Sequence, residues 1–159
     1  MFMLLYLLTY VVEYKMFEIR NIQKSDIPTL VKLEEELLKE TVGCEMLQSE
    51  LHNQFAYFYV GVYDNEVIGY LSVWMVEETV DVINFVIDKR YQHKGYGIAL
   101  FNKMVSVAKE KNMKEIMLEV KEHNYQAIKF YQHQDFEQIS IRNNYYQDGS
   151  NALIMKKVI

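Results

Sequence analysis

The sequence has few of the residues that staple or interrupt small folds: one cysteine, one proline and six glycines among 159 residues. A single cysteine excludes an internal disulfide framework and fits a reducing compartment, so we expect a cytoplasmic protein. With 50% hydrophobic residues, the chain is long enough to bury a substantial core, which argues against disorder. We therefore expect one folded domain.

Metal-ligand spacing is missing as well. His52, His93, His123 and His133 show no such spacing with one another or with Cys44, and we predict no metal. No histidine lies near Cys44 in the sequence. We therefore expect this cysteine to be a small, partly buried apolar residue and not a nucleophile.

Positive charge is scarce, because 17 lysines and arginines face 22 acidic residues and the formal net charge is -5. Non-specific nucleic-acid binding depends on lysine and arginine meeting phosphates, so we expect no direct contact with nucleic acid. An acidic protein is compatible with a basic protein partner. We expect a monomer or a weak dimer.

The apolar segment from Met1 to Val12 is too short to span a bilayer as a helix, and it lacks a basic region and a small-residue cleavage site. It is either an added element that packs on the domain or on a neighbouring chain, or the result of an upstream translation start. We favour the second interpretation, with Met16 as the functional start, because an exposed apolar segment would promote aggregation. This divides the chain into an extension over residues 1–15 and a single domain over residues 16–159, with no membrane contact.

Hydrophobic periodicity predicts the elements of this domain. Ser25 or Asp26 is expected to cap the first helix, with Pro28 in its first turn and Glu34 to Glu36 on its solvated face. Helices are predicted over residues 27–40, 45–53, 98–111 and 125–134, and strands over 17–20, 55–63, 67–76, 80–87, 115–120, 136–141 and 151–158. A hairpin joins the second and third strands, and strands alternate with helices later in the chain, so the order indicates a mixed α/β sheet.

The most informative segment joins the run Val82–Ile87 to the helix expected from Ile98, and it reads Gln92-His93-Lys94-Gly95-Tyr96-Gly97. Without Cβ atoms at the two glycines, successive N–H groups can converge on one point, and the start of the helix adds partial positive charge. That geometry suits a pyrophosphate, and Lys89, Arg90, His93 and Lys94 add positive charge beside it.

The competing interpretation of this loop is a tight strand-to-helix connection. A Walker-type loop is disfavoured because no Gly-Lys-Ser/Thr follows, and a Rossmann fingerprint is disfavoured because Leu100 stands where a third glycine or alanine is needed.

Taken together with five other motifs, the loop resembles that of the GNAT acetyltransferases, and most of all the ribosomal-protein alanine N-acetyltransferases of bacteria. The other motifs are Asn84-Phe85-Val86-Ile87-Asp88, Leu118-Glu119-Val120-Lys121, Asn124 with Ala127-Ile128, Phe130-Tyr131 and Arg142-Asn143-Asn144-Tyr145-Tyr146. The resemblance spans Met16 to Met155 and implies a GNAT-type fold of about seven strands and four helices, with splayed central strands. It also implies that acetyl-coenzyme A binds across the splay.

The resemblance assigns cofactor contacts to three parts of the chain. The backbone of Phe85, Val86 and Ile87 would pair with the pantetheine amides as an extra strand does. Gln92, His93, Lys94, Gly95, Tyr96, Gly97 and Ile98 would hold the pyrophosphate, and Asn124 matches the family's cofactor-contacting asparagine. A ligand with amides and phosphates needs both a strand edge and an anion-binding loop.

Glu119 stands at the position of the family's general base, and Tyr131 at that of the acid that protonates the departing thiolate. Because an α-ammonium group has a pKa of about 8, a base must remove its proton before the amine attacks a thioester. We expect partial burial to raise the pKa of Glu119 toward neutrality. The alternatives are an ordinary strand-end carboxylate for Glu119 and a core aromatic or positioning residue for Tyr131.

The substrate is less well indicated. Tyr145 and Tyr146 are similar to the paired tyrosines that wall the peptide entrance in protein N-terminal acetyltransferases, although hairpin packing would also explain them. The chain departs from the family at Gln134-Asp135-Phe136, which replaces Leu-Gly-Phe, at Ser150-Asn151 and at Thr41-Val42-Gly43-Cys44. We expect Asp135 to adopt the positive φ of the missing glycine.

The sequence therefore predicts an enzyme that acetylates a protein N-terminus, in particular the N-terminal alanine of a ribosomal protein. A small-amine acetyltransferase and a non-catalytic acetyl-coenzyme A-binding module are the alternatives.

Overall fold

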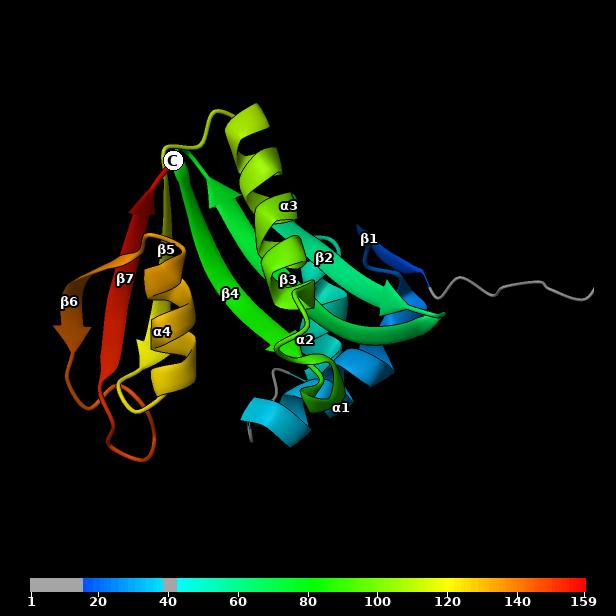
Figure 1. Cartoon of the computed structure of the whole chain (residues 1–159), viewed down its shortest axis with the longest axis horizontal. Coiled ribbons are helices and arrows are strands. Elements are labelled where there is room, and N and C mark those ends of the chain that lie inside the picture. Colours follow the sequence, from blue (N-terminus) through cyan, green and yellow to red (C-terminus); the bar gives the residue numbers. More distant parts are fainter. Residues whose placement is uncertain (1–15, 39–42) are drawn as a thin grey trace, which may run out of the picture.

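Apolar runs in the described residues form seven strands that join in one sheet, in the order β1-β2-β3-β4-β5-β7-β6 (Figure 1). The computed structural model describes residues 16–38 and 43–159, so the expected extension over residues 1–15 lies outside the described residues. The strands are β1 (Phe17–Asn21), β2 (Ala56–Tyr63), β3 (Glu66–Val76), β4 (Thr79–Ile87), β5 (Glu115–Lys121), β6 (Glu137–Arg142) and β7 (Ala152–Val158). The α-helices of the described residues are α1 (Ile27–Leu38), α2 (Gly43–Glu50), α3 (Tyr96–Glu110) and α4 (Tyr125–His133). The predicted mixed α/β fold class is confirmed.

The predicted hairpin joins β2 to β3. Asp64 and Asn65 form its turn, with φ angles of 53° and 63°. Two consecutive left-handed residues are typical of the type I′ turn, whose twist matches that of the paired strands. Strand β4 then returns antiparallel to β3, which leaves its other edge toward β5.

The sheet opens at its centre. Strands β4 and β5 run parallel and pair only between Thr79–Asp81 and Glu115–Met117. Beyond these residues the strands diverge, and Figure 1 shows the opening as a V. The predicted splay is confirmed, and within the described residues the β5-facing edge of β4 from Val82 to Ile87 pairs with no strand.

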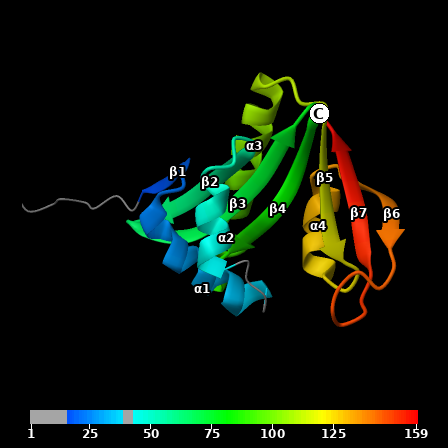
Figure 2. The same cartoon turned by 180° about the vertical axis from the view of Figure 1, so that it is seen from behind.

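Helices cover the two faces of the sheet unequally. Helices α3 and α4 lie on one face, α3 over β2 to β4 and α4 over β5 and β7, whereas α1 and α2 lie on the other face over β2 to β4 (Figures 1 and 2). The core beneath α3 includes Leu100, Phe101, Met104 and Ala108, as its periodicity predicted. On the face away from α4, the described helices leave β5, β7 and β6 uncovered (Figure 2).

Glu34 does not belong to the solvated face of α1, as the sequence pattern suggested. Its side chain is fully buried, whereas Glu35 and Glu36 are exposed. The hydroxyl of Tyr70 on β3 donates a hydrogen bond to the Glu34 carboxylate. A buried polar group of this kind persists because hydrogen-bond partners replace its water shell.

Two smaller expectations are also corrected. A short 3₁₀ helix over Lys24–Asp26 precedes α1. The Asp26 carboxylate binds the guanidinium of Arg20 at 2.7 and 2.9 Å and accepts a hydrogen bond from the N–H of Gln23 at the start of this 3₁₀ helix. Cys44 is exposed and not partly buried, because the residue that α2 buries is Leu47.

Candidate functional site

The segment expected to pair with the cofactor, Phe85–Ile87, lies on the free edge of β4 beside the splay. Just before it, the pairing with β3 skips Ile83, which makes a β-bulge where the strand turns away from β5. On β3, Gly69 allows the two strands to approach closely, because a Cβ there would lie 2.3 Å from the carbonyl oxygen of Val86. The ring of Phe85 packs against Phe130 of α4, with 5.6 Å between centroids.

The glycine loop connects this edge to α3. Gly95 is the residue before the helix and has a φ of 88°, a left-handed conformation that glycine adopts without strain. The side-chain amide of Gln92 donates to the carbonyl oxygen of Ile87 at 2.8 Å, which ties the loop to the end of β4. The first N–H groups of a helix have no partner within it, so this turn presents N–H donors at the mouth of the splay.

The side-chain charges beside the loop are partly neutralised within the protein. The Arg90 guanidinium binds Asp88 at 2.7 Å and Glu66 at 2.5 Å. The Lys94 ammonium donates to the carbonyl oxygen of Arg90 at 2.7 Å. An anion at this loop would therefore depend more on backbone N–H groups than the sequence suggested.

Tyr96 is held by other aromatic rings. Its ring lies 4.7 Å from that of Phe17 and 5.6 Å from that of Tyr63, centroid to centroid. Because its ring is packed in this way, Tyr96 would contact a pyrophosphate through its backbone N–H. Ile98, in the first turn of α3, is 46% exposed.

The start of α4 meets the glycine loop across the opening. Asn124 caps this helix, because its side-chain oxygen accepts a hydrogen bond from the N–H of Ala127 at 3.2 Å. Gln126 lies 3.4 Å from the side-chain oxygen of Gln92 and 3.3 Å from the Nε2 atom of His93. The loop and Asn124, predicted to bind one ligand, thus lie on two segments that contact each other.

Glu119 lies on β5 beside the opening, and its side chain is 31% exposed. The Oε1 atom of Glu119 is 2.5 Å from Nη1 of Arg142. The Glu119 carboxylate also forms a hydrogen bond with the hydroxyl of Tyr145, and this bond raises the pKa of Tyr145. Asp81 on β4 is near enough that the charge of Glu119 adds to burial in raising the pKa of the aspartate. The carboxylate is therefore a partly buried, ion-paired group on the edge of the splay.

Tyr131 is buried in the core between α4 and the sheet, at 8% exposure. Its ring lies 5.4 Å from both Phe130 and Phe136, centroid to centroid. Burial raises the pKa of Tyr131, so its phenol keeps its proton at neutral pH. Nearby, Asp135 has a φ of 63°, as expected for the residue that replaces a glycine.

Glu119 and Tyr131 lie on opposite faces of the sheet. Leu118 and Val120 belong to the same core as Tyr131, and alternate residues of a strand point to opposite faces, so Glu119 points away from that core. Its face is the one that the described helices leave uncovered on β5, β7 and β6 (Figure 2). Two ligands can thus approach the opening from different sides.

The loop between β6 and β7 carries the paired tyrosines, whose rings meet edge to face at 5.2 Å. Both N–H groups, of Tyr145 and Tyr146, donate to the carbonyl oxygen of Ser150 at 3.1 Å. Asn151 donates to the Glu122 carboxylate through both its backbone N–H, at 2.9 Å, and its side chain, at 3.0 Å. Where the chain departs from the resembled family, Asn151 therefore fixes this loop to the end of β5, and Ser150 closes the loop on itself.

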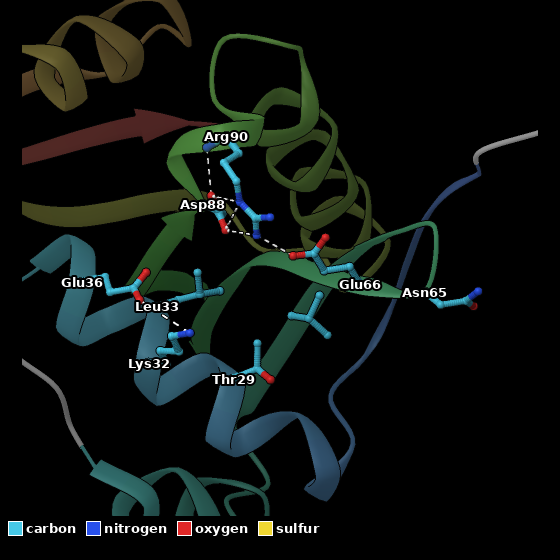
Figure 3. Close-up of a pocket in the computed structure, with 9 residues that line it drawn as sticks. Thr29, Lys32, Leu33, Glu36, Asn65, Glu66, Asp88 and Arg90 are labelled. Atoms are coloured by element: carbon cyan, nitrogen blue, oxygen red, sulfur yellow. Dashed lines mark hydrogen bonds and ion pairs between the residues drawn. The ribbon is translucent and has the colours of Figure 1, made fainter.

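A hollow of about 760 Å³ lies elsewhere, between α1 and the ends of β3 and β4 (Figure 3). Its lining includes neither Glu119 nor the glycine loop, and consists of Thr29, Lys32, Leu33, Glu36, Asn65, Glu66, Val67, Asp88 and Arg90. The Arg90 side chain in it is engaged by Asp88 and Glu66. We assign it no ligand.

In residues 16–38 and 43–159, no group of three or more His, Cys, Asp and Glu side chains is arranged to hold a metal ion.

Three residues of the site were not identified as such from the sequence: Gly69, Gln126 and Arg142. Gly69 sits in a strand pattern, where a glycine signals close backbone approach, and this signal was available. Gln126 contacts residues that are 33 and 34 positions away in the sequence, and Arg142 contacts one that is 23 positions away. The local sequence pattern therefore gives no sign of these contacts.

Comparisons with known proteins agree with this geometry. The sequence profile described as "Acetyltransferase (GNAT) family" matches residues 16–136. The chain is 30% identical over 139 residues to a putative ribosomal protein bS18-alanine N-acetyltransferase of Bacillus subtilis, covering 86% of this chain and 92% of the relative. It is 27% identical over 154 residues to an N-alpha-acetyltransferase of Saccharolobus solfataricus, covering 89% and 92%. The crystal structure of Ard1 from Thermoplasma volcanium superimposes with a TM-score of 0.84 at 26% identity, covering 90% of this chain and 97% of that one.

Proposed function

The chain belongs to the acetyltransferase (GNAT) family, whose members use acetyl-coenzyme A, and from this premise we propose that it acetylates the N-terminal α-amine of a protein. The acceptor we favour is the N-terminal alanine of a ribosomal protein, as the name of the Bacillus subtilis relative suggests. The net charge of -5 suits a basic protein of that kind. We place the reaction in the cytoplasm and in a single domain over residues 16–159.

The residues at the splay fit acetyl-coenzyme A. The free edge of Phe85–Ile87 offers N–H and C=O groups to the pantetheine amides, and the turn at Gly95 offers N–H groups to the pyrophosphate. Asn124 borders the same space at the start of α4. When bound, the cofactor supplies an activated acetyl thioester.

Glu119 acts as the general base, directly or through a water, and takes one proton from the acceptor ammonium group. The resulting neutral amine attacks the thioester carbonyl, a C–N bond forms, and the C–S bond breaks as the coenzyme A thiolate leaves. The nitrogen loses its second proton to solvent, which gives the neutral amide. Tyr131 protonates this thiolate or positions it. The departing group needs little acid catalysis, because a thiol of pKa about 8.5 is already a tolerable leaving group. Tyr145 and Tyr146 wall the acceptor's approach.

One observation carries this proposal: Glu119 points to the uncovered face of the sheet, while the free edge of β4 and the glycine loop border the same opening. An acceptor and a thioester can then meet without a covalent enzyme intermediate. The enzyme needs no nucleophile of its own.

The test is an acetylation assay of wild type and Glu119→Gln with three acceptors: a peptide with N-terminal alanine, the same peptide blocked at its N-terminus and carrying one lysine, and spermidine. We expect turnover of the first, and a fall in kcat of about 10²- to 10⁴-fold in Glu119→Gln, the usual value of a general base. Glu115→Gln is the matched control, a carboxylate on the same face of β5 that pairs with Lys156 at 2.9 Å.

Preference for spermidine would favour a small-amine acetyltransferase. Unchanged turnover in Glu119→Gln would remove the base assignment. Cofactor binding without turnover of any of the three acceptors would favour the non-catalytic module.

A further inference from the structure

Arg142 lies where the proposed reaction needs a cation to arrive. It is the last residue of β6 and pairs with Ala152 of β7, which in turn pairs with Lys121 of β5. From there its side chain crosses β7 to place Nη1 2.5 Å from Oε1 of Glu119. The Arg142 guanidinium is therefore bound to the Glu119 carboxylate, the same group that would receive the acceptor ammonium.

Lys121, two residues along β5 on the same face, is engaged by Asp148 at 3.0 Å, so the cation paired with the Glu119 carboxylate is Arg142. Tyr145 shares a hydrogen bond with it from the loop after β6, and Asp81 faces it from β4. On its own strand, Glu115 is paired with Lys156 of β7. Removing Arg142 without replacement would leave the charges of Glu119 and Asp81 to repel each other.

Arg142 cannot serve in the reaction as a proton source, because an arginine does not lose its proton in a protein. Its side chain is 56% exposed, and its guanidinium also lies 5.4 Å from the centre of the Tyr145 ring, a contact that can still hold the cation when Glu119 binds another partner.

We propose that Arg142 is a specificity-determining residue that holds the acceptor's place on Glu119 and is displaced by the arriving ammonium group. This inference rests on the proposed role of Glu119. The exchange replaces one positive charge by another, so a protonated amine can complete it and a neutral ligand cannot. The site then favours acceptors that arrive charged and deliver their proton to Glu119 once bound.

The test measures binding apart from turnover. Calorimetry with coenzyme A present gives the dissociation constant of the N-terminal alanine peptide for wild type, Arg142→Gln and Arg142→Lys. We expect Arg142→Gln to bind the peptide about two- to five-fold more tightly, which is the value of one partly exposed ion pair. Arg142→Lys should bind it as wild type does, because an ammonium group still competes. A residue that only supported the fold would weaken binding when removed.

A double-mutant cycle identifies the route of the effect. The Glu119→Gln variant has no carboxylate at this position for Arg142 and the acceptor ammonium to compete for. Adding Arg142→Gln to it should therefore leave peptide affinity unchanged. Weaker or equal binding by Arg142→Gln alone, or the same gain in the Glu119→Gln background, would overturn the inference. Failure of the proposed function is seen separately, as undiminished kcat in Glu119→Gln.

Discussion

Glu34 shows how a distant partner decides the place of a charged side chain. The carboxylate has no exposed surface, although it lies beside two exposed glutamates on α1. Tyr70 donates to it from β3, and the side-chain nitrogen of Asn84 lies 3.3 Å from Oε1. Asn84 adjoins the bulge of β4, so this contact joins α1 to the strand that borders the splay.

Tyr70→Phe should lower the free energy of unfolding by about 1–3 kcal/mol, because the buried Glu34 carboxylate loses a donor that water cannot replace. Urea denaturation at pH 7 measures this. Tyr125→Phe is the matched control, since Tyr125 is 71% exposed and the same change there should stay within about 0.5 kcal/mol. Equal effects of the two substitutions would mean that the Tyr70 hydroxyl adds little.

Single residues were predictable where their reason was local. The positive φ of Asp135 followed from the turn chemistry of an aspartate in place of glycine. The burial of Glu34 depends on a tyrosine 36 residues away. The ion pair between Arg142 and Glu119 depends on the order β5-β7-β6, and no periodicity reports which strands become neighbours.

At the scale of elements, the strands and helices followed the sequence pattern to within a few residues. Continuous runs of aromatic and β-branched residues marked both strands of the β2–β3 hairpin, and the 3.6-residue stripe marked α3. The 3₁₀ helix before α1 was missed, because it is held by the Arg20 and Asp26 side chains and has no stripe of its own. The glycine loop was predicted as an anion site from backbone freedom, which its left-handed Gly95 supports.

Gly95→Ala should weaken acetyl-coenzyme A binding about three- to tenfold. No atom lies within 4 Å of the added Cβ, so the change acts through the left-handed φ of 88°, which an alanine holds at a cost of about 1 kcal/mol. The loop would relax and its N–H groups would lose their convergence. Calorimetric titration with acetyl-coenzyme A measures the dissociation constant.

Gly149→Ala is the matched control for this substitution. Gly149 has a φ of 80° and is equally open, but it lies in the loop between β6 and β7. Both variants should lose similar thermal stability, and only Gly95→Ala should lose cofactor affinity. If both bind acetyl-coenzyme A as wild type does, the loop is a simple strand-to-helix connection.

At the scale of the whole molecule, the two halves of the sheet meet through a short ladder. Strands β4 and β5 share three paired positions, from Thr79–Glu115 to Asp81–Met117, and then separate. Below that ladder, the contact of Gln126 with Gln92 and His93 bridges the glycine loop and α4. A ligand bound in the opening would contact both halves of the sheet, so its binding should stabilise the whole molecule.

Acetyl-coenzyme A at 100 times its dissociation constant should stabilise the protein by about 2.7 kcal/mol and raise Tm by roughly 5–10 °C, because it binds the folded chain and not the unfolded one. Glu119→Gln should show the same rise, since Glu119, the proposed base, points to the face of the sheet that the described helices leave uncovered. In hydrogen exchange, the amides of β4 between Asn84 and Ile87 that face the opening should become protected, as those of a strand do when a neighbour is added. Protection confined to α1 and the hollow in Figure 3 would instead place the cofactor there, and the splay would lose its assigned ligand.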